Sequence, residues 1–302
     1  MTPVLADAQL EEYLARVGPP GDLDVAALRR SARERGRLRS PGPDVHEVRD
    51  LRIGQLKARL YRPTAGNIPL IIFLHGGGWT IGDLETHDRL CRRLAHRSGV
   101  AVLAVDYRLA PENPWPASID DAVAAVHWVA SNPEVLDPPP RAIAIGGDSA
   151  GGTLAALACL RLRDELPDVL SLQVLLYANT DLTGAQPSMS ERAHGWGLDA
   201  HAIRFFNSQW VPDASRWADP DVSPLFAPEL LGLPKALIVT AEFDPLRDEL
   251  EAYATRLVDA QVDVTLRREA GLIHGFMTLD EVSPACSRAV DRVAGDLRSL
   301  LH

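Results

Sequence analysis

Short apolar runs alternate with helical patterns along the chain from residue 45 onward. Continuous apolar runs at 70–74, 101–105 and 142–145 are typical of parallel strands that are buried on both faces. Between such runs lie segments with apolar positions three and four residues apart, which is the helical period. The alternation predicts a mostly parallel sheet covered by helices on both faces, which is the arrangement of an α/β domain.

The same pattern predicts eight strands and five longer helices. We expect the first two strands to form an antiparallel hairpin around Gly54-Gln55. The strands are expected at 45–53, 56–62, 70–74, 101–105, 142–145, 171–177, 236–240 and 262–268, and the helices at 85–98, 117–131, 150–163, 247–260 and 284–301. We therefore predict a single α/β domain that spans residues 1–302.

Two stretches, 1–44 and 181–222, do not follow the alternation. The first has amphipathic spacing of its apolar residues, at Leu10, Tyr13, Leu14 and Val17. The second concentrates aromatic residues in a chain that is only 6% aromatic: Trp196, Phe205, Phe206, Trp210 and Trp217. Because long insertions of this kind often wall a ligand pocket, we predict that the two stretches form a lid. The alternative is that the rings only attach the second stretch to the body.

The composition fits an enzyme with a full-sized core, since 46% of the 302 residues are hydrophobic and 24% are charged. The net charge is -10, from 41 acidic and 31 basic residues, which argues against nucleic acid as a partner. The most basic run, 29–39, is interrupted by Glu34 on a helical pattern, so we interpret it as a solvated helix face.

The three cysteines, Cys91, Cys159 and Cys286, lack the spacing of a zinc site or of a disulfide framework. We therefore expect a reducing, cytoplasmic location. The first twenty residues have no basic start followed by an apolar run, so no secretory signal is expected. No segment approaches the roughly 20 apolar residues that a membrane span requires.

A motif of the form G-x-S-x-G lies where a predicted strand meets a predicted helix. It is Gly147-Asp148-Ser149-Ala150-Gly151, and Gly152 follows. A sharp turn between strand and helix forces the serine into strained backbone angles and exposes its hydroxyl group. The helix N-terminus also favours a developing negative charge. Ser149 is therefore the candidate nucleophile, and the alternative is a glycine-rich turn with a passive serine.

A second glycine-rich element, His75-Gly76-Gly77-Gly78-Trp79, follows the predicted strand at 70–74. Consecutive glycines can point backbone N–H groups into a cavity, as an oxyanion site requires, and each such bond is worth about 2.7–4 kcal/mol. We expect the donors to be the N–H groups of Gly76, Gly77 and Ala150. A phosphate-binding loop is the competing interpretation, but the sequence lacks its Gly-Lys-Ser/Thr ending.

A serine nucleophile needs a histidine base and an acid that follow it in the order Ser, Asp, His. His274 lies between the last predicted strand and the closing helix, where an imidazole can reach the strand ends. Asp244 follows the penultimate strand and is the candidate acid that orients His274. Glu242 and Asp248 are the alternatives, although we expect Asp248 to lie on the next helix.

Taken together, these motifs resemble the hormone-sensitive-lipase family, the GDSAG type of α/β-hydrolase carboxylesterase. The resemblance covers about residues 45–300 and rests on HGGGW at 75–79, DYRLAPE at 106–112, GDSAGG at 147–152, DPL at 244–246 and HGF at 274–276. It implies the roles given above for Ser149, Asp244 and His274, and it implies that 107–112 and Asp121 support the oxyanion loop. It also implies a lid made of an N-terminal part and an insertion after the sixth strand.

The sequence departs from that family at two positions: Tyr177-Ala178 replaces a common Tyr-Pro pair, and Asn113 replaces a common histidine. Both changes affect loops rather than the three candidate catalytic residues.

We predict hydrolysis of short-chain acyl esters through an acyl-serine intermediate, with no metal and no organic cofactor. The rings expected to contact the small-molecule ester are Trp79, Trp196, Phe205, Phe206 and Trp210. Removal of an acyl group from an amine by the same residues is the nearest alternative, and a non-catalytic protein that binds a small ligand is a third. A homodimer is a further expectation, because the predicted last strand is apolar around 262–266 and lies at a sheet edge.

Overall fold

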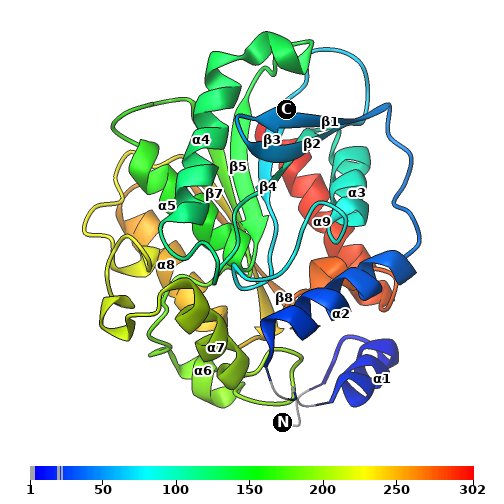
Figure 1. Ribbon diagram of the computed structural model, residues 1–302, viewed down its shortest axis with the longest axis vertical. Coiled ribbons are helices and arrows are strands. Elements are labelled where there is room, and N and C mark those ends of the chain that lie inside the picture. Colours follow the sequence, from blue (N-terminus) through cyan, green and yellow to red (C-terminus); the bar gives the residue numbers. More distant parts are fainter. Residues whose placement is uncertain (1–3, 19–20, 22) are drawn as a thin grey trace.

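The structure is a computed structural model that describes residues 4–18, 21 and 23–302, so residues 1–3, 19–20 and 22 of the predicted 1–44 stretch lie outside it. Within the described residues, eight strands form one twisted sheet in the order β1-β2-β4-β3-β5-β6-β7-β8 (Figure 1). The strands are β1 (Glu47–Ile53), β2 (Leu56–Arg62), β3 (Leu70–Leu74), β4 (Ala101–Asp106), β5 (Ile143–Asp148), β6 (Leu170–Leu176), β7 (Lys235–Phe243) and β8 (Val264–Ile273).

The pairing of the strands confirms the predicted mostly parallel sheet. β1 is antiparallel to β2, and β2 is antiparallel to β4. All other neighbouring pairs are parallel. The carboxyl ends of the parallel strands therefore meet at one edge of the sheet, where open α/β sheets bind their ligands.

Three strands extend at least three residues further toward this edge than the sequence pattern predicts. β5 continues to Asp148, β7 to Phe243 and β8 to Ile273. The added residues include glycine and charged side chains, which an apolar pattern does not identify, and pairing with the neighbouring strand makes them extended. As a consequence, Ser149 and His274 follow directly after strand ends.

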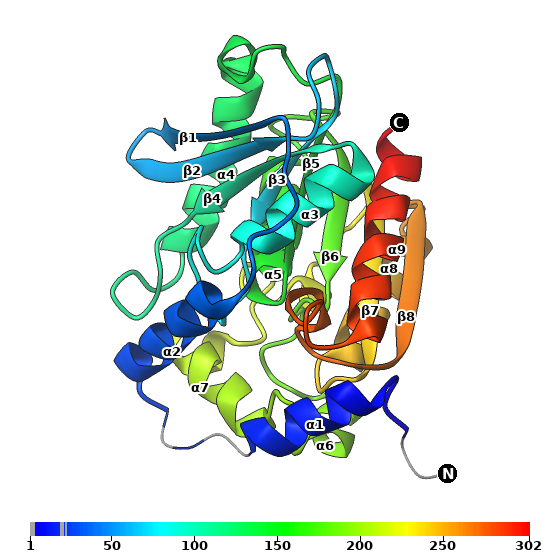
Figure 2. The same cartoon turned by 90° about the vertical axis from the view of Figure 1, so that its right-hand side faces the viewer.

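Five helices cover the two faces of the sheet, as predicted. Helices α4, α5 and α8 lie on one face, and α3 and α9 lie on the other, in front of the sheet in Figure 2. Their bounds are α3 (Asp88–Ser98), α4 (Ala117–Ser131), α5 (Ala150–Leu162), α8 (Arg247–Asp259) and α9 (Pro284–Leu301). Single 3-10 turns lie at η1 (Pro133–Leu136), η2 (Ala214–Arg216), η3 (Pro224–Phe226) and η4 (Phe276–Thr278). No helix in the described ranges is both long and apolar enough to cross a membrane.

The helix after the G-x-S-x-G motif packs unusually closely on the sheet because its first turn is made of small residues. A Cβ atom on Gly147 or on Gly151 would overlap the carbonyl oxygen of Leu74 in β3. Only glycine therefore allows β5 and α5 to approach β3 this closely. The approach places the start of α5 beside the glycine-rich element that follows β3.

The two non-alternating stretches contain helices of their own at the carboxyl edge of the sheet (Figure 2). These are α1 (Ala8–Val17) and α2 (Val25–Leu38) in the first stretch, and α6 (Pro187–Glu191) and α7 (Ala200–Trp210) in the second. Arg29 of α2 donates to the carbonyl oxygens of Thr80 and Ala110, and it also forms an ion pair with Glu112. These contacts attach the N-terminal stretch to the loops that follow β3 and β4.

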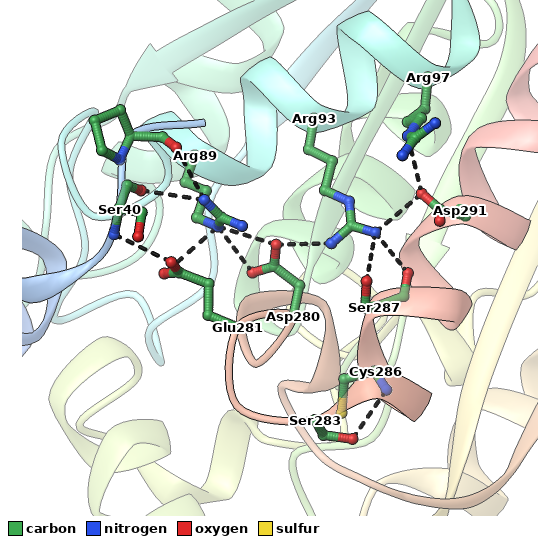
Figure 3. Close-up of polar contacts among 11 residues, drawn as sticks. Ser40, Arg89, Arg93, Arg97, Asp280, Glu281, Ser283, Cys286, Ser287 and Asp291 are labelled. Carbon is green, nitrogen blue, oxygen red and sulfur yellow. Dashed lines mark hydrogen bonds and ion pairs between the residues drawn. The ribbon is translucent and has the colours of Figure 1, made fainter. Parts of the chain in front are cut away.

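An arginine cluster holds the segment that follows β8. Asp280 accepts from Arg89 and Arg93 of α3, at 3.0 and 2.8 Å (Figure 3). Arg93 also donates to the backbone of Ser287 and pairs with Asp291, both on α9. The cluster therefore joins α3, α9 and the loop between β8 and α9.

Candidate active site

Ser149 stands at the turn between β5 and α5, in a backbone conformation that non-glycine residues rarely adopt. Its φ is 52° and its ψ is -122°. Two residues near it are also strained, since Trp79 has φ 55° and Tyr177 has φ 39°. The Ser149 N–H donates to the carbonyl oxygen of Leu176 at 2.8 Å, which fixes the turn against β6. Strained backbone of this kind persists only where the surrounding structure enforces it, and it concentrates at functional sites.

Three side chains from three strand ends form one hydrogen-bonded chain. His274 Nε2 lies 3.0 Å from Ser149 Oγ, and His274 Nδ1 lies 2.8 Å from Asp244 Oδ2. The carboxylate of Asp244 is fully buried, and its other oxygen accepts from the N–H of Leu246 at 2.9 Å. This geometry allows the imidazole to take a proton from the serine while the carboxylate holds the ring.

The two alternative acids have other partners. Glu242 Oε2 accepts from the N–H of Gly271 at 2.7 Å, and Asp248, on α8 as expected, accepts from the N–H of Ser188 at 2.9 Å. Of the three candidate acids, only Asp244 contacts His274 in the structure.

The imidazole ring is also supported by aromatic contacts. Tyr177 meets the ring of His274 edge-on, with 4.9 Å between centroids, and meets Phe276 in the same way at 5.1 Å. Edge-to-face packing of this kind fixes the plane of a ring without using its nitrogen atoms. Both nitrogens of His274 therefore remain available to Ser149 and Asp244.

The structure corrects the expected oxyanion donors at one position. The N–H of Gly76 donates to Asp148 Oδ1 at 2.8 Å, so it is occupied and cannot also serve a substrate oxygen. The next two N–H groups, of Gly77 and Gly78, donate to no acceptor in the described part of the chain. Gly78 lines the cavity beside Ser149 and Ala150, and Ala150 is the first residue of α5. The free N–H groups at this site are therefore those of Gly77, Gly78 and Ala150.

Asp148, the residue before the candidate nucleophile, joins the two glycine-rich elements. Besides the N–H of Gly76, its buried carboxylate faces His87, whose Nε2 lies 3.3 Å from Oδ1. Burial raises the pKa of Asp148, but His87, the Gly76 N–H and His75 together hold that pKa below its ordinary value. Asp148 is thus a charged acceptor that fixes the first glycine of the loop.

His75 itself is buried and supports the same loop. Burial and the neighbouring His87 lower the pKa of His75 to about 4, so the ring is neutral at physiological pH. The ring stacks on Tyr107 with 4.3 Å between centroids, and the Tyr107 hydroxyl donates to the carbonyl oxygen of His75 at 2.7 Å. Nearby, Asp121 accepts from both the backbone and the guanidinium of Arg108.

A small cavity of about 30 Å³ opens beside Ser149. This is room for one or two water molecules. Its lining comes from both glycine-rich elements, from the strand ends and from α7: Gly78, Trp79, Ser149, Ala150, Asn179, Leu198, Ile203, Phe206, Asn207 and Leu246. A Cβ atom on Gly78 would overlap the ring of Phe206, so this glycine allows α7 to lie directly over the loop.

The five rings expected to contact the substrate lie in different places. Trp79 and Phe206 line the cavity, and Phe205 packs edge-on against Phe206 without lining it. Trp210 is fully buried behind Trp79, and their rings stack at 4.1 Å.

Trp196 also lies away from the cavity lining. It stacks on Phe243 at 4.4 Å. The structure therefore revises the expectation for Phe205, Trp196 and Trp210. Trp196 and Trp210 instead stack on rings of the body of the protein. This agrees with the alternative that such rings attach the 181–222 stretch to the body.

The sequence pattern did not indicate five apolar or amide residues of the lining: Asn179, Leu198, Ile203, Asn207 and Leu246. Asn179 could have been found, because it follows the sixth strand at the functional edge of the sheet. The others carry no local signal, since their position depends on how the 181–222 stretch folds back. Gly78 belongs to the glycine-rich motif. Only the hydrogen bond from Gly76 to Asp148 shows which N–H groups of this motif are left without an acceptor.

Comparison with known proteins shows a family and several similar enzymes. A family model described as "alpha/beta hydrolase fold" matches residues 71–278. The chain is similar to a carboxylic ester hydrolase, LipN, of Mycobacterium tuberculosis, with 43% identity over 86% of this chain and 73% of the relative. It is also similar to an ethyl acetate hydrolase of Pseudomonas putida, with 37% identity over 75% of this chain and 73% of the relative.

Among solved structures, a hyperthermophilic esterase from the archaeon Pyrobaculum calidifontis superimposes with a TM-score of 0.90. The two share 36% sequence identity, and the match covers 99% of each chain. The similarity therefore includes the two non-alternating stretches as well as the sheet.

Proposed function

Because the chain belongs to the α/β-hydrolase fold family and is a serine carboxylic ester hydrolase, we propose that Ser149 is its nucleophile, His274 its base and Asp244 its acid. The observation that carries this assignment is the continuous chain of hydrogen bonds, 3.0 and 2.8 Å long, from Ser149 through His274 to Asp244. The relatives favour ester hydrolysis over amide deacetylation and over ligand binding without catalysis.

In the proposed reaction, Ser149 Oγ attacks the ester carbonyl carbon while His274 Nε2 takes the hydroxyl proton. Asp244 stabilises the imidazolium through the bond to Nδ1. The carbonyl oxygen becomes negatively charged and accepts from the N–H groups of Gly77, Gly78 and Ala150. His274 then gives its proton to the departing alcohol, and a water molecule releases the acid from the acyl-serine in a second, equivalent cycle.

Replacement of Ser149 by alanine tests the assignment. We expect the purified protein to hydrolyse p-nitrophenyl butyrate and Ser149→Ala to lose roughly 10⁴-fold or more in kcat, because nucleophile and base act as one unit. Ser190→Ala, at an exposed position on α6, is the matched control and should keep parental activity. Equal activity of the Ser149 variant and the parent would refute the assigned nucleophile.

We further propose that the substrates are small esters with short acyl chains, under a lid formed by the 1–44 and 181–222 stretches. The small cavity volume supports this, as does the position of α7 over the cavity. Turnover is expected to fall steadily from short to long acyl chains. An optimum at long chains would contradict the proposal.

Three further properties are proposed from the composition and from the sheet edge. The free and buried Cys91, Cys159 and Cys286 support a reducing, cytoplasmic compartment, and the net charge of -10 argues against a nucleic-acid partner. The edge strand β8, where Leu266 exposes 47% of its surface, supports a homodimer. Light scattering at micromolar concentration should give twice the chain mass, and a monomer mass would contradict the dimer.

A further inference from the structure

The strained residue Trp79 directly follows Gly77 and Gly78, the two glycines whose N–H groups are proposed oxyanion donors. Its φ of 55° lies in the left-handed region, which a non-glycine residue keeps only where its surroundings enforce it. The N–H of Ala110 donates to the carbonyl oxygen of Trp79 at 2.9 Å, and the N–H of Thr80 donates to that of Gly77 at 3.1 Å. The conformation at Trp79 therefore helps to set how the peptide groups of the two glycines are oriented.

The side chain of Trp79 is held by stacking rather than by a hydrogen bond. Its ring is buried and lies nearly parallel to the ring of Trp210, with 4.1 Å between the centroids and 9° between the planes. Its own Nε1 is buried and has no acceptor within the described residues. Because the packing of one flat ring on another restrains both position and tilt, the stack with Trp210 fixes the side chain of Trp79.

Trp210 is anchored to the body of the protein, although it is the last residue of α7 in the second non-alternating stretch. It is fully buried, and its Nε1 donates to Oγ of Ser118, near the start of α4, at 3.0 Å. Its carbonyl oxygen accepts from the N–H of Trp115 at 2.8 Å. A side chain that is fixed by packing and hydrogen bonds is a rigid support for its neighbours. Trp210 therefore gives Trp79 a fixed platform.

A second side chain of α7 lies against the same loop. Phe206 precedes Trp210 by four residues, so the two side chains share one face of the helix. The ring of Phe206 lies against Gly78, where a Cβ atom would overlap it, and the ring of Trp210 lies against Trp79. One face of α7 therefore covers two consecutive residues of the glycine-rich element at 75–79.

Resting on the proposed esterase function, we propose that Trp210 is a positioning residue for the oxyanion donors. It acts through Trp79, which it holds in the conformation that directs the N–H groups of Gly77 and Gly78 at the carbonyl oxygen. Trp210 is absent from the lining of the cavity, so it does not act by touching the substrate. Donors stabilise the transition state only when they are held close to their correct positions, so loss of the platform slows the chemical step. The second stretch then contributes to catalysis besides covering the cavity.

Two substitutions of Trp210 test the proposal with p-nitrophenyl butyrate. Trp210→Leu removes the flat ring, and we expect kcat to fall about 10- to 100-fold with little change in KM, because the donors act mainly on the transition state. Trp210→Phe keeps a smaller ring over Trp79 and should lower kcat about threefold. Trp217→Phe is the matched control. It makes the same substitution in the same stretch and removes an indole hydrogen bond, to the carbonyl oxygen of Val211, and it should keep parental kcat.

Two further measurements distinguish positioning of the donors from a general loosening of the fold. A serine hydroxyl attacks propyl trifluoromethyl ketone to give a tetrahedral oxyanion adduct, so the inhibition constant of this ketone reports stabilisation of the oxyanion. We expect the constant to rise in each Trp210 variant by the factor by which kcat falls. The ratio of kcat/KM for p-nitrophenyl acetate to that for the butyrate should keep its parental value, because the donors act on the carbonyl group that both esters share. A displaced α7 would change the cavity wall and with it this ratio.

Parental kcat and a parental inhibition constant in a folded Trp210→Leu variant would overturn the inference, and so would a fall in kcat that the inhibition constant does not follow. If circular dichroism shows that Trp210→Leu does not fold, Trp210→Phe decides by the same measurements, and parental values in that variant would overturn the inference. Failure of the proposed function is distinguishable, because Ser149→Ala would then be as active as the parent whatever the Trp210 variants do.

Discussion

At the scale of single residues, Asp148 connects the turn of the proposed nucleophile to the proposed oxyanion loop. Its main chain precedes Ser149, and its carboxylate holds the N–H of Gly76, the first glycine of the loop. The free N–H groups of Gly77 and Gly78 follow directly. A donor must lie within a few tenths of an ångström of its position to stabilise the transition state, so an anchor one residue away affects the rate.

Replacing Asp148 by alanine should therefore lower kcat about 10- to 100-fold with little change in KM, because the loop that aims the donors loses its anchor. Steady-state kinetics on p-nitrophenyl butyrate measure both constants. Asp164→Ala, at an exposed position, serves as the control. A variant that changes KM alone would show that Asp148 acts on substrate binding instead.

Glu249 is a buried carboxyl group whose surroundings change its pKa. It is fully buried at the start of α8 and accepts from the N–H groups of Thr180 and Asp181. Burial, followed by the nearby Asp181, raises the pKa of Glu249 well above its ordinary value. The folded protein therefore retains a proton that the unfolded chain releases once the pH exceeds about 4.5.

It follows that part of the stability of the folded protein is lost as the pH rises above 4.5. Glu249→Gln keeps an acceptor for the backbone N–H groups and has no proton to lose. We expect the variant to be more stable than the parent at pH 8, with a difference that shrinks toward pH 4.5. Urea unfolding at several pH values measures the free energy of unfolding of both proteins. If the difference between them stays constant with pH, Glu249 is not protonated in the folded protein.

At the scale of elements, α7 sets the depth of the cavity. Ile203, Phe206 and Asn207 lie on the face of this helix that covers Ser149, while Phe205 packs on Phe206 and is not part of the lining. Phe206 stands over Gly78, so its ring limits the space that an acyl chain can occupy. The helix therefore contributes a wall that can be changed one side chain at a time.

Phe206→Ala should enlarge the cavity and shift the preference toward longer acyl chains. We expect kcat/KM for octanoate relative to butyrate to rise about tenfold, since each methylene that enters apolar surroundings is worth about 0.8 kcal/mol. Phe205→Ala removes an adjacent ring of the same size that does not line the cavity, and it should leave the chain-length profile unchanged. Identical profiles for the two variants would contradict the assigned wall.

At the scale of the whole molecule, the arginine cluster in Figure 3 ties the loop between β8 and α9 to α3 and to the N-terminal stretch. Arg89 donates to the carbonyl oxygen of Pro41 as well as to Asp280. The Asp280 side chain is only 5% exposed. Burial raises the pKa of Asp280, but Arg89 and Arg93 together hold that pKa below its ordinary value. Asp280 thus stabilises the fold above the ordinary aspartate pKa, and this contribution is lost as the pH falls.

Asp280→Ala should destabilise the protein by about 3 kcal/mol near pH 7, because it removes the buried carboxylate that two largely buried arginines share. The loss should shrink as the pH is lowered through the acidic range. Asp291→Ala removes a 43% exposed partner of the same Arg93, and it should cost about 1 kcal/mol or less. Thermal unfolding of the two variants measures how much stability each one loses. Equal losses would contradict a larger contribution of the buried Asp280 than of the exposed Asp291.

The sequence by itself determined the class of the fold and pointed to Ser149 and His274, but it left three candidate acids, of which only Asp244 contacts His274 in the structure. Buried parallel strands are apolar throughout, so their positions are visible in the local pattern, as at Leu70–Leu74. The turn around Ser149 needs glycines for its close contacts, and His274 and Asp244 follow strands in a fixed order. Each of these features depends on neighbours in the chain.

Tertiary structure alone decided which groups line the cavity beside Ser149 and which N–H groups there lack an acceptor. Gly76 and Gly77 are equivalent in the sequence, but the carboxylate of Asp148 occupies only the N–H of Gly76. Phe206 reaches the cavity while Trp196 stacks on Phe243, because the 181–222 stretch folds back without a periodic pattern. The contacts of such side chains come from distant segments, and no local period of the sequence encodes them.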